Sequence, residues 1–274
     1  IEKKQFPYML CVTNLLLHGI DNPLVYHDNS LIKDVLNYTD DDKFDVILMN
    51  PPYGGNEKSD VKSHFPSDMR SSETADLFMV LIMYRLKEKG RAAVIVPDGF
   101  LFGTDNAKLA IRAKLLKDFN LHTIIRLPGK VFAPYTDIAT NIIFFNNEIA
   151  VGAPDGYSTK ETWFYRLDMP EGYKHFSKTK PMKLEHTAPI SEWWNDRKEI
   201  ISDGDEKSRR FSVEELIASD CNFDRCKFPK EEEEVLPPKQ LLEEYYKKRK
   251  ALEHQIDKTL QEIQDILGFK IEID

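Results

Sequence analysis

The tetrad Asn50-Pro51-Pro52-Tyr53 has residue types and an order that fit one specific chemistry. A proline has a fixed φ, lacks an N–H group and pushes the residue before it out of the helical region. The turn is therefore stiff, and the Asn50 side-chain oxygen and the Pro51 carbonyl can both accept hydrogen bonds. Two such acceptors suit an amino group conjugated to a ring, because its delocalised lone pair is weakly nucleophilic.

Hydrogen bonds to both N–H groups of such an amine would draw its nitrogen toward tetrahedral geometry. The freed lone pair could then attack an electrophilic methyl group, by electrostatic preorganisation and without a nucleophile or general base. Tyr53 offers a ring on which a planar base can stack. We therefore assign catalytic roles to all four residues of the tetrad, although Asn-Pro-Pro is also an ordinary way to end a strand.

The segments on either side of the tetrad must hold it in place. Residues 44–49 (FDVILM) form an apolar run typical of a strand covered on both faces of a sheet. Ligands of open α/β sheets bind beyond the carboxyl ends of the strands, which is where Asn50 would lie. Residues 54–73 read as a long polar loop without structure of its own, and their position would let them close over a bound base.

Apolar, β-rich runs alternate with helical periodicity in the first half of the chain. Strands are expected at 24–26, 44–49, 91–96, 122–127 and 141–145, and helices at 9–18, 74–87 and 107–118. This alternation predicts an α/β fold with a mostly parallel sheet and crossover helices. Beyond residue 150 the pattern weakens, and we expect a strand at 161–167, a helix at 190–199 and a helix beginning at Ser212.

One long helix is expected over residues 239–267. Leu242, Ile256 and Ile263 share one heptad position, and Tyr245, Leu252 and Ile266 share another. Heptads over this length favour a partner-binding coiled-coil arm, although a solvated charged helix would also fit the run 247–250.

Composition and charge narrow the class of protein. No apolar run approaches the ~20 residues that a membrane span needs, so we expect no membrane partner. Three cysteines without a Cys-x-x-Cys pair and seven scattered histidines argue against disulfides and a metal site, and favour a reducing cytoplasm. The formal net charge of −8 weighs against a chain that holds DNA alone, although a basic partner subunit could supply the phosphate contacts.

Four blocks of the sequence resemble the modification (methyltransferase) subunit of type I restriction–modification systems. They are residues 14–20 (NLLLHGI), 45–53, 90–102 (GRAAVIVPDGFLF) and 126–145, and the resemblance covers nearly the whole chain. It implies a Rossmann-like, S-adenosylmethionine-dependent methyltransferase sheet. It also implies site-specific methylation of adenine N6 in double-stranded DNA, with the adenine flipped out because N6 is unreachable inside the duplex.

The resemblance also assigns residues to a site for S-adenosylmethionine. Glu2 matches the acidic residue that binds the ribose hydroxyls, and Asp28 with Asn29 matches the position beside the adenine of the donor. Asn50 would face this site as well as the target base. Phe78 falls in a block that lies beside the donor pocket in relatives, and it could equally be a core residue. Without the family, Glu2 and Asp28 would indicate only solvated carboxylates.

Relatives carry a first strand and a glycine-rich turn upstream of the position that Glu2 matches, and the chain starts at Ile1 without either. We therefore expect a piece of a longer protein that alone binds the donor poorly and does not turn over. The expected divisions are a partial catalytic domain over 1–150, a mixed α/β extension over 151–236 and a subunit-contact helix over 237–274. In relatives the C-terminal region contacts the specificity subunit, and a restriction subunit joins the full complex in a bacterial or archaeal cytoplasm.

Three other interpretations remain open. A protein glutamine-N5 methyltransferase also uses Asn-Pro-Pro-Tyr, but such enzymes are compact and would leave the long heptad helix unexplained. Methylation of cytosine N4 in DNA is chemically closer to methylation of adenine N6 than glutamine methylation is. A non-catalytic assembly module, which recruits a partner through residues 239–267, belongs to a different class altogether.

Overall fold

The computed structural model of the protein describes residues 1–202, 205–226 and 238–267. The chain divides into two compact units, residues 1–229 and 230–274. The division expected at residue 150 stays a prediction, and the strands before and after it belong to one sheet. Among the described residues, no helix has both the length and the apolar character that crossing a bilayer requires.

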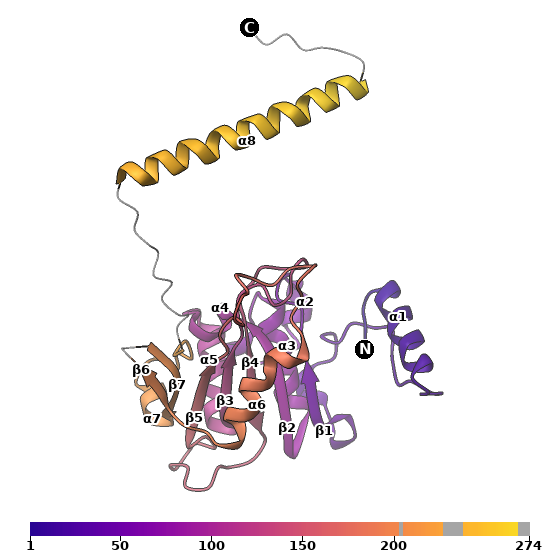
Figure 1. The fold of residues 1–274 in the computed structure, drawn as a ribbon. Coiled ribbons are helices and arrows are strands. Elements are labelled where there is room, and N and C mark those ends of the chain that lie inside the picture. The colour runs from indigo at the N-terminus through magenta and orange to yellow at the C-terminus, as the bar shows by residue number, and fades with distance from the viewer. Residues whose placement is uncertain (203–204, 227–237, 268–274) are drawn as a thin grey trace. The chain divides into compact units, whose positions relative to one another are not determined.

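Seven strands of the first unit form one sheet in the order β1-β2-β4-β3-β5-β7-β6 (Figure 1). Their bounds are β1 Phe44–Met49, β2 Leu86–Pro97, β3 Asn120–Arg126, β4 Thr140–Asn146, β5 Glu161–Arg166, β6 Ile200–Ser202 and β7 Asp205–Ser212. β1 with β2 and β3 with β5 are parallel pairs, and the other neighbours are antiparallel. The predicted α/β class is confirmed, but the expectation of a mostly parallel sheet is wrong.

The connections explain this mixture. Parallel neighbours need a crossover of a dozen residues or more, and α3 (Thr74–Arg85) lies in the crossover between β1 and β2. Between β3 and β4 the chain runs through residues 127–139 without a helix and turns back on itself. β4 therefore lies antiparallel between β2 and β3, a reversal that the apolar runs alone could not reveal.

Helices cover both faces of the sheet. The remaining helices of the first unit are α1 Gln5–Leu17, α2 Ser59–Lys62, α4 Asp98–Phe102, α5 Asn106–Asp118, α6 Ala188–Asn195 and α7 Val213–Ile217. Ile124 and Ile125 point to opposite faces of β3 because side chains alternate along a strand. Ile124 joins the core that α3 and α5 build, whereas Ile125 joins a smaller cluster with Trp193 of α6.

β1 differs from the expected strand buried on both faces. It is a terminal strand of the described sheet and pairs only with β2. Phe44, Val46 and Leu48, which share one face, are 49%, 44% and 77% exposed, and Ile47 is buried on the other. An unbroken apolar run therefore predicted the strand correctly but not the covering of its two faces.

Residues 54–73 are not the structureless loop that the sequence suggested. They contain α2 and a short 3-10 helix, η3 (Ser67–Met69). Val61, Phe65 and Met69 recur every four residues, and all three are buried in the core that α3 and α5 share. The segment is thus packed against the sheet domain, which argues against a freely moving cover for the base.

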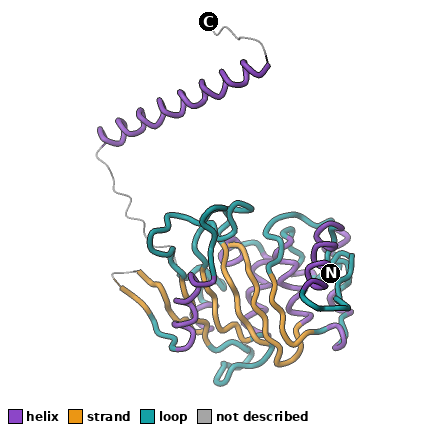
Figure 2. Tube along the Cα trace, turned by 45° about the vertical axis from the view of Figure 1, so that its right-hand side comes forward, coloured by secondary structure: helices purple, strands orange, loops and turns teal. Residues whose placement is uncertain are grey.

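The N-terminal 30 residues form the least buried stretch of the first unit. α1 was predicted from residue 9 and begins at Gln5, and the figures show it beyond the β1 edge of the sheet (Figures 1 and 2). None of residues 1–30, all of which the structure describes, is buried. The strand expected at 24–26 does not form, and a single parallel bridge between Glu2 and His27 takes its place.

The described part of the second unit is α8, Pro238–Leu267, which confirms the predicted long helix. The apolar side chains at the two predicted heptad positions are all exposed: Leu242, Tyr245, Leu252, Ile256, Ile263 and Ile266. Within its unit the helix thus carries an apolar stripe that nothing described covers.

Candidate active site

The Asn50–Tyr53 turn directly follows the carboxyl end of β1. Asn50 is exposed, Pro51 is buried and Tyr53 is partly buried, so the turn is rooted in the fold while the amide side chain faces solvent. The Tyr53 hydroxyl donates a short hydrogen bond to Asn50 Oδ1. An amide oxygen has two lone pairs, so Asn50 retains capacity to accept a second hydrogen bond from a ligand.

A second aromatic ring lies beside Tyr53. The ring centroids of Tyr53 and Phe132 are 5.8 Å apart, with the planes tilted by 53°. Burial raises the pKa of Tyr53 to about 12, against the opposing effect of its hydrogen bond to Asn50, so the hydroxyl stays protonated near neutral pH. Sequence reasoning did not single out Phe132 beyond its place in the block 126–145, because its partner Tyr53 lies far away along the chain.

Charged and amide side chains hold the two ends of the loop that carries Phe132. Arg126, at the end of β3, donates to Asn141 Oδ1 at 3.4 Å and to Asp224 Oδ1 at 2.7 Å. Asn141, at the start of β4, donates to Asp98 Oδ1 at 2.5 Å. Both ends of the segment 127–139 are therefore held together, which limits the positions that Phe132 can take.

Residues 221–226 close over the same end of the sheet. The Phe223 N–H donates to the Leu101 carbonyl at 2.9 Å, and the Phe223 side chain is fully buried. Arg112 Nε donates to the Cys221 carbonyl at 2.7 Å. This late segment of the chain is thus part of the structure that supports the Phe132 loop.

The structure brings together two of the residues assigned to the methyl donor. The Glu2 N–H donates to the Tyr26 carbonyl at 2.9 Å, and the Asp28 N–H donates to the Glu2 carbonyl at 3.2 Å. Asp28 is exposed and Glu2 partly so, and each carboxylate accepts a backbone N–H from a close neighbour, Lys4 N for Glu2 and Asn29 N for Asp28. The main chains of Glu2 and Asp28 are therefore neighbours, and each residue carries a carboxylate able to accept a hydrogen bond from a hydroxyl of a ligand.

Phe78 lies on α3, where it is partly buried and packs against the main core. This position leaves both interpretations of Phe78 standing, and its role toward a donor stays a prediction. Among the described residues, no cluster of three His, Cys, Asp or Glu side chains has a geometry suited to a metal ion.

The sequence model of the family described as N-6 DNA Methylase matches residues 1–235. The chain belongs to the N-6 DNA methylase family. Over 272 residues the chain is 42% identical to the type I restriction enzyme EcoEI methylase subunit of Escherichia coli, and the match covers 98% of this chain and 52% of that relative. It therefore spans about half the length of the curated relatives that it matches.

Solved structures that resemble the chain belong to type I restriction–modification systems as well. A modification subunit of a type I restriction enzyme from Vibrio vulnificus YJ016 is 43% identical, with a TM-score of 0.69 over 78% of this chain and 43% of that one. A chain from a study of complex assembly and conformational transition in the type I restriction–modification system is 33% identical, with a TM-score of 0.71 over 97% of this chain and 53% of that one. The resemblance noted in the sequence is confirmed.

Proposed function

We propose that this chain carries the target-base site of a type I modification subunit, which methylates adenine N6 in double-stranded DNA. The observation that carries the proposal is the exposed Asn50 amide at the end of β1, with the half-buried Tyr53 ring beside it. Packing of Asn50 into the interior would have argued against it. The family membership supports the same chemistry.

The residues of the turn have separate tasks in this proposal. Asn50 Oδ1 and the Pro51 carbonyl accept the two N–H groups of the adenine amine, which localises the lone pair on nitrogen. The Tyr53 hydroxyl, held protonated by burial, orients the Asn50 amide by donating to its oxygen. The rings of Tyr53 and Phe132 offer faces for the extruded base, and stacking of this kind stabilises bases without reading their sequence.

S-adenosylmethionine, when bound, supplies the electrophilic methyl group. The acids Glu2 and Asp28, whose main chains are joined by a hydrogen bond, suit it, because the ribose of that donor presents two hydroxyls whose hydrogen bonds carboxylates can accept. Asn29 supports this arrangement by donating its N–H to Asp28 and accepting the Leu31 N–H on its own side chain. The methylated ammonium that results is acidic enough to lose its proton to water, so no dedicated base is needed.

The exposed heptad stripe of α8 supports a role in subunit contact. We propose the specificity subunit as its partner, with the restriction subunit present in the full complex in the cytoplasm. This arrangement accommodates the net charge of −8, because a partner subunit would then supply sequence reading and much of the phosphate contact.

A labelled-methyl transfer assay on double-stranded DNA tests the proposal directly. The full-length protein is assayed with and without its specificity subunit, and the methylated DNA is digested to nucleosides. We expect N6-methyladenine, formed only with the specificity subunit present. Labelled N4-methylcytosine, or label on a glutamine-containing peptide with none on DNA, would contradict the proposal.

A further inference from the structure

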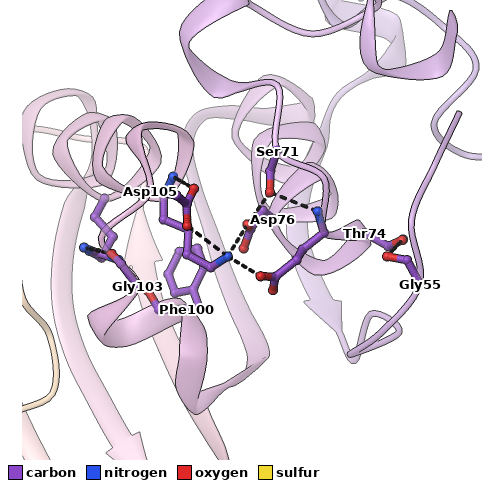
Figure 3. A network of polar contacts seen from close by, with 10 residues as sticks. Gly55, Ser71, Thr74, Asp76, Phe100, Gly103 and Asp105 are labelled. Atoms are coloured by element: carbon purple, nitrogen blue, oxygen red, sulfur yellow. Dashed lines mark hydrogen bonds and ion pairs between the residues drawn. The ribbon is translucent and has the colours of Figure 1, made fainter. Parts of the chain in front are cut away.

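Lys108 of α5 is a nearly buried cation that the proposed chemistry does not use. Its side chain is 5% exposed, and its Nζ lies 2.5 Å from Glu73 Oε1, 3.1 Å from Asp76 Oδ2 and 3.3 Å from Asp105 Oδ2. Burial alone would lower the pKa of Lys108, but Glu73 and Asp76 outweigh burial and raise it, so the amine stays charged. Asp76 of α3 and Asp105, the N-cap residue of α5, converge on this amine (Figure 3).

Asp76 is the most deeply buried member of this group, with no exposed surface. Its Oδ2 accepts a hydrogen bond from Ser71 Oγ at 2.6 Å as well as the contact from Lys108. Burial raises the pKa of Asp76 above its ordinary value, and the contacts with Ser71 and Lys108 offset only part of that rise. A buried carboxylate requires a countercharge, and within this network Lys108 supplies it.

The same network reaches the turn that holds Asn50. Thr74, at the start of α3, donates to the Gly55 carbonyl through both its hydroxyl, at 2.8 Å, and its N–H, at 3.2 Å (Figure 3). Next to it, Glu73 forms a β-bridge with Asn56 while its carboxylate contacts Lys108. Gly55 and Asn56, which follow Tyr53 after one residue, are thus tied to the start of α3, where Glu73 and Asp76 contact the Lys108 amine.

Gly103 leaves room for the Lys108 stem. A Cβ at position 103 would come within 2.3 Å of Lys108 Cδ, a clash that only displacement of one of them could relieve. The Gly103 carbonyl is itself fixed by a 2.7 Å hydrogen bond from Arg112. The lysine therefore crosses from α5 to α3 along a defined path rather than lying on a surface.

We propose that Lys108 is a positioning residue that sets the place of the Asn50–Tyr53 turn by drawing Glu73 and Asp76 of the α3 end toward α5. The inference rests on the proposed function, since the turn is taken to bind the target adenine. Loss of the lysine should let the segment 54–56 shift. The two acceptors proposed for the adenine amino group, Asn50 Oδ1 and the Pro51 carbonyl, would shift with it. A misplacement of about 1 Å at a reacting centre can cost on the order of 100-fold in rate.

The test uses the full-length protein with its specificity subunit and three variants of the lysine. Lys108→Met removes the charge, Lys108→Met with Asp76→Asn also removes the carboxylate left without a partner, and Lys108→Arg keeps a cation. Lys114→Met is the matched control, because Lys114 lies on the same helix and pairs with Asp118 at the surface. For each, the methyl-transfer kcat, the donor KM, the thermal midpoint and the fluorescence of 2-aminopurine at the target position are measured.

We expect the double variant to recover thermal stability yet to keep a kcat lowered by about 10- to 100-fold, with an unchanged donor KM and a weaker 2-aminopurine signal. Lys108→Arg should recover part of the rate, and the control should match the unaltered protein. If the double variant recovers kcat together with stability, Lys108 only supports the fold and the inference is wrong.

Two further variants keep the test decisive. Should the Lys108 variants fail to fold, Glu73→Gln weakens the same link at a half-exposed carboxylate, and an unchanged kcat there overturns the inference. Asn50→Ala separates this inference from the proposed function. Full DNA methylation by that variant would refute the proposed function itself, whatever Lys108 does.

Discussion

The two sides of the proposed active site are built in different ways. The turn that would bind adenine follows a strand, has the buried Pro51 at its root and is tied through Gly55 and Thr74 to a buried ionic network. The acids that would bind the donor lie within residues 1–30, of which none is buried. Activation of an amine depends on hydrogen-bond direction, so rigid support is needed at the turn that would bind adenine. Capture of ribose hydroxyls depends less on exact direction, so it tolerates residues that are supported by fewer buried neighbours.

The largest effect is expected from Asn50→Ala in the full-length protein. Methyl transfer to DNA should fall at least ~10²–10³-fold, because one preorganised acceptor is lost. The thermal midpoint should hardly change, since Asn50 is exposed and exposed side chains contribute little to stability. A drop in rate that merely follows loss of folded protein, measured by calorimetry, would contradict the assignment.

Phe132→Ala should come next, with DNA methylation reduced about 30-fold, because base–aromatic stacking contributes ~2 kcal/mol. Tyr135→Ala is the control, since Tyr135 lies in the same loop and is 92% exposed. The 2-aminopurine signal at the target position provides the measurement. Equal effects of the two substitutions would show that the loop, rather than the Phe132 ring, matters.

On the donor side, Glu2→Gln should weaken S-adenosylmethionine binding about fivefold, because an exposed hydrogen bond contributes ~1 kcal/mol. The kcat at saturating donor and the thermal midpoint should both stay unchanged. Titration calorimetry on the full-length protein measures the affinity, with Asp21→Asn as an exposed carboxylate of the same segment for comparison. A large fall in the thermal midpoint would mean that Glu2 supports the fold, and that the donor side does not differ from the adenine side in the way described.

The smallest expected effect is a difference in the free energy of unfolding between variants of two threonines. Thr74→Val removes the hydroxyl bound to Gly55 and should lower the free energy of unfolding by ~1 kcal/mol. Thr13→Val, on exposed α1, should change it by less than ~0.5 kcal/mol. Denaturant titration of both variants decides the point, and equal values would remove the contrast between the two sides.

Local signals predicted the elements that carry the site. β1 was predicted with its observed bounds, and α3 and α5 within two residues at either end, because apolar periodicity and turn residues act over a few positions. The Asn50–Tyr53 turn followed from the same signals. None of this required knowledge of which strands become neighbours.

What the sequence could not supply depends on distant partners. The exposed face of β1 follows from its place at the end of the described sheet, and the reversal of β4 follows from a loop that contains no helix. Phe132 and Lys108 each meet partners from separate elements, so no spacing singled them out. In residues 54–73 the buried Val61, Phe65 and Met69 were outnumbered by polar neighbours, which hid the packed segment.

The ion pair between Arg126 and Asp224 joins residues 98 positions apart. At the usual pace of translation, about 5–20 residues per second, Asp224 is synthesised roughly 5–20 s after Arg126. The sheet can form during that interval together with the Arg126–Asn141 and Asn141–Asp98 hydrogen bonds, but the contact of Arg126 with Asp224 forms only after residues 221–226 have left the ribosome. The end of the sheet that bears Asn50 is therefore completed late in synthesis, only shortly before α8 emerges.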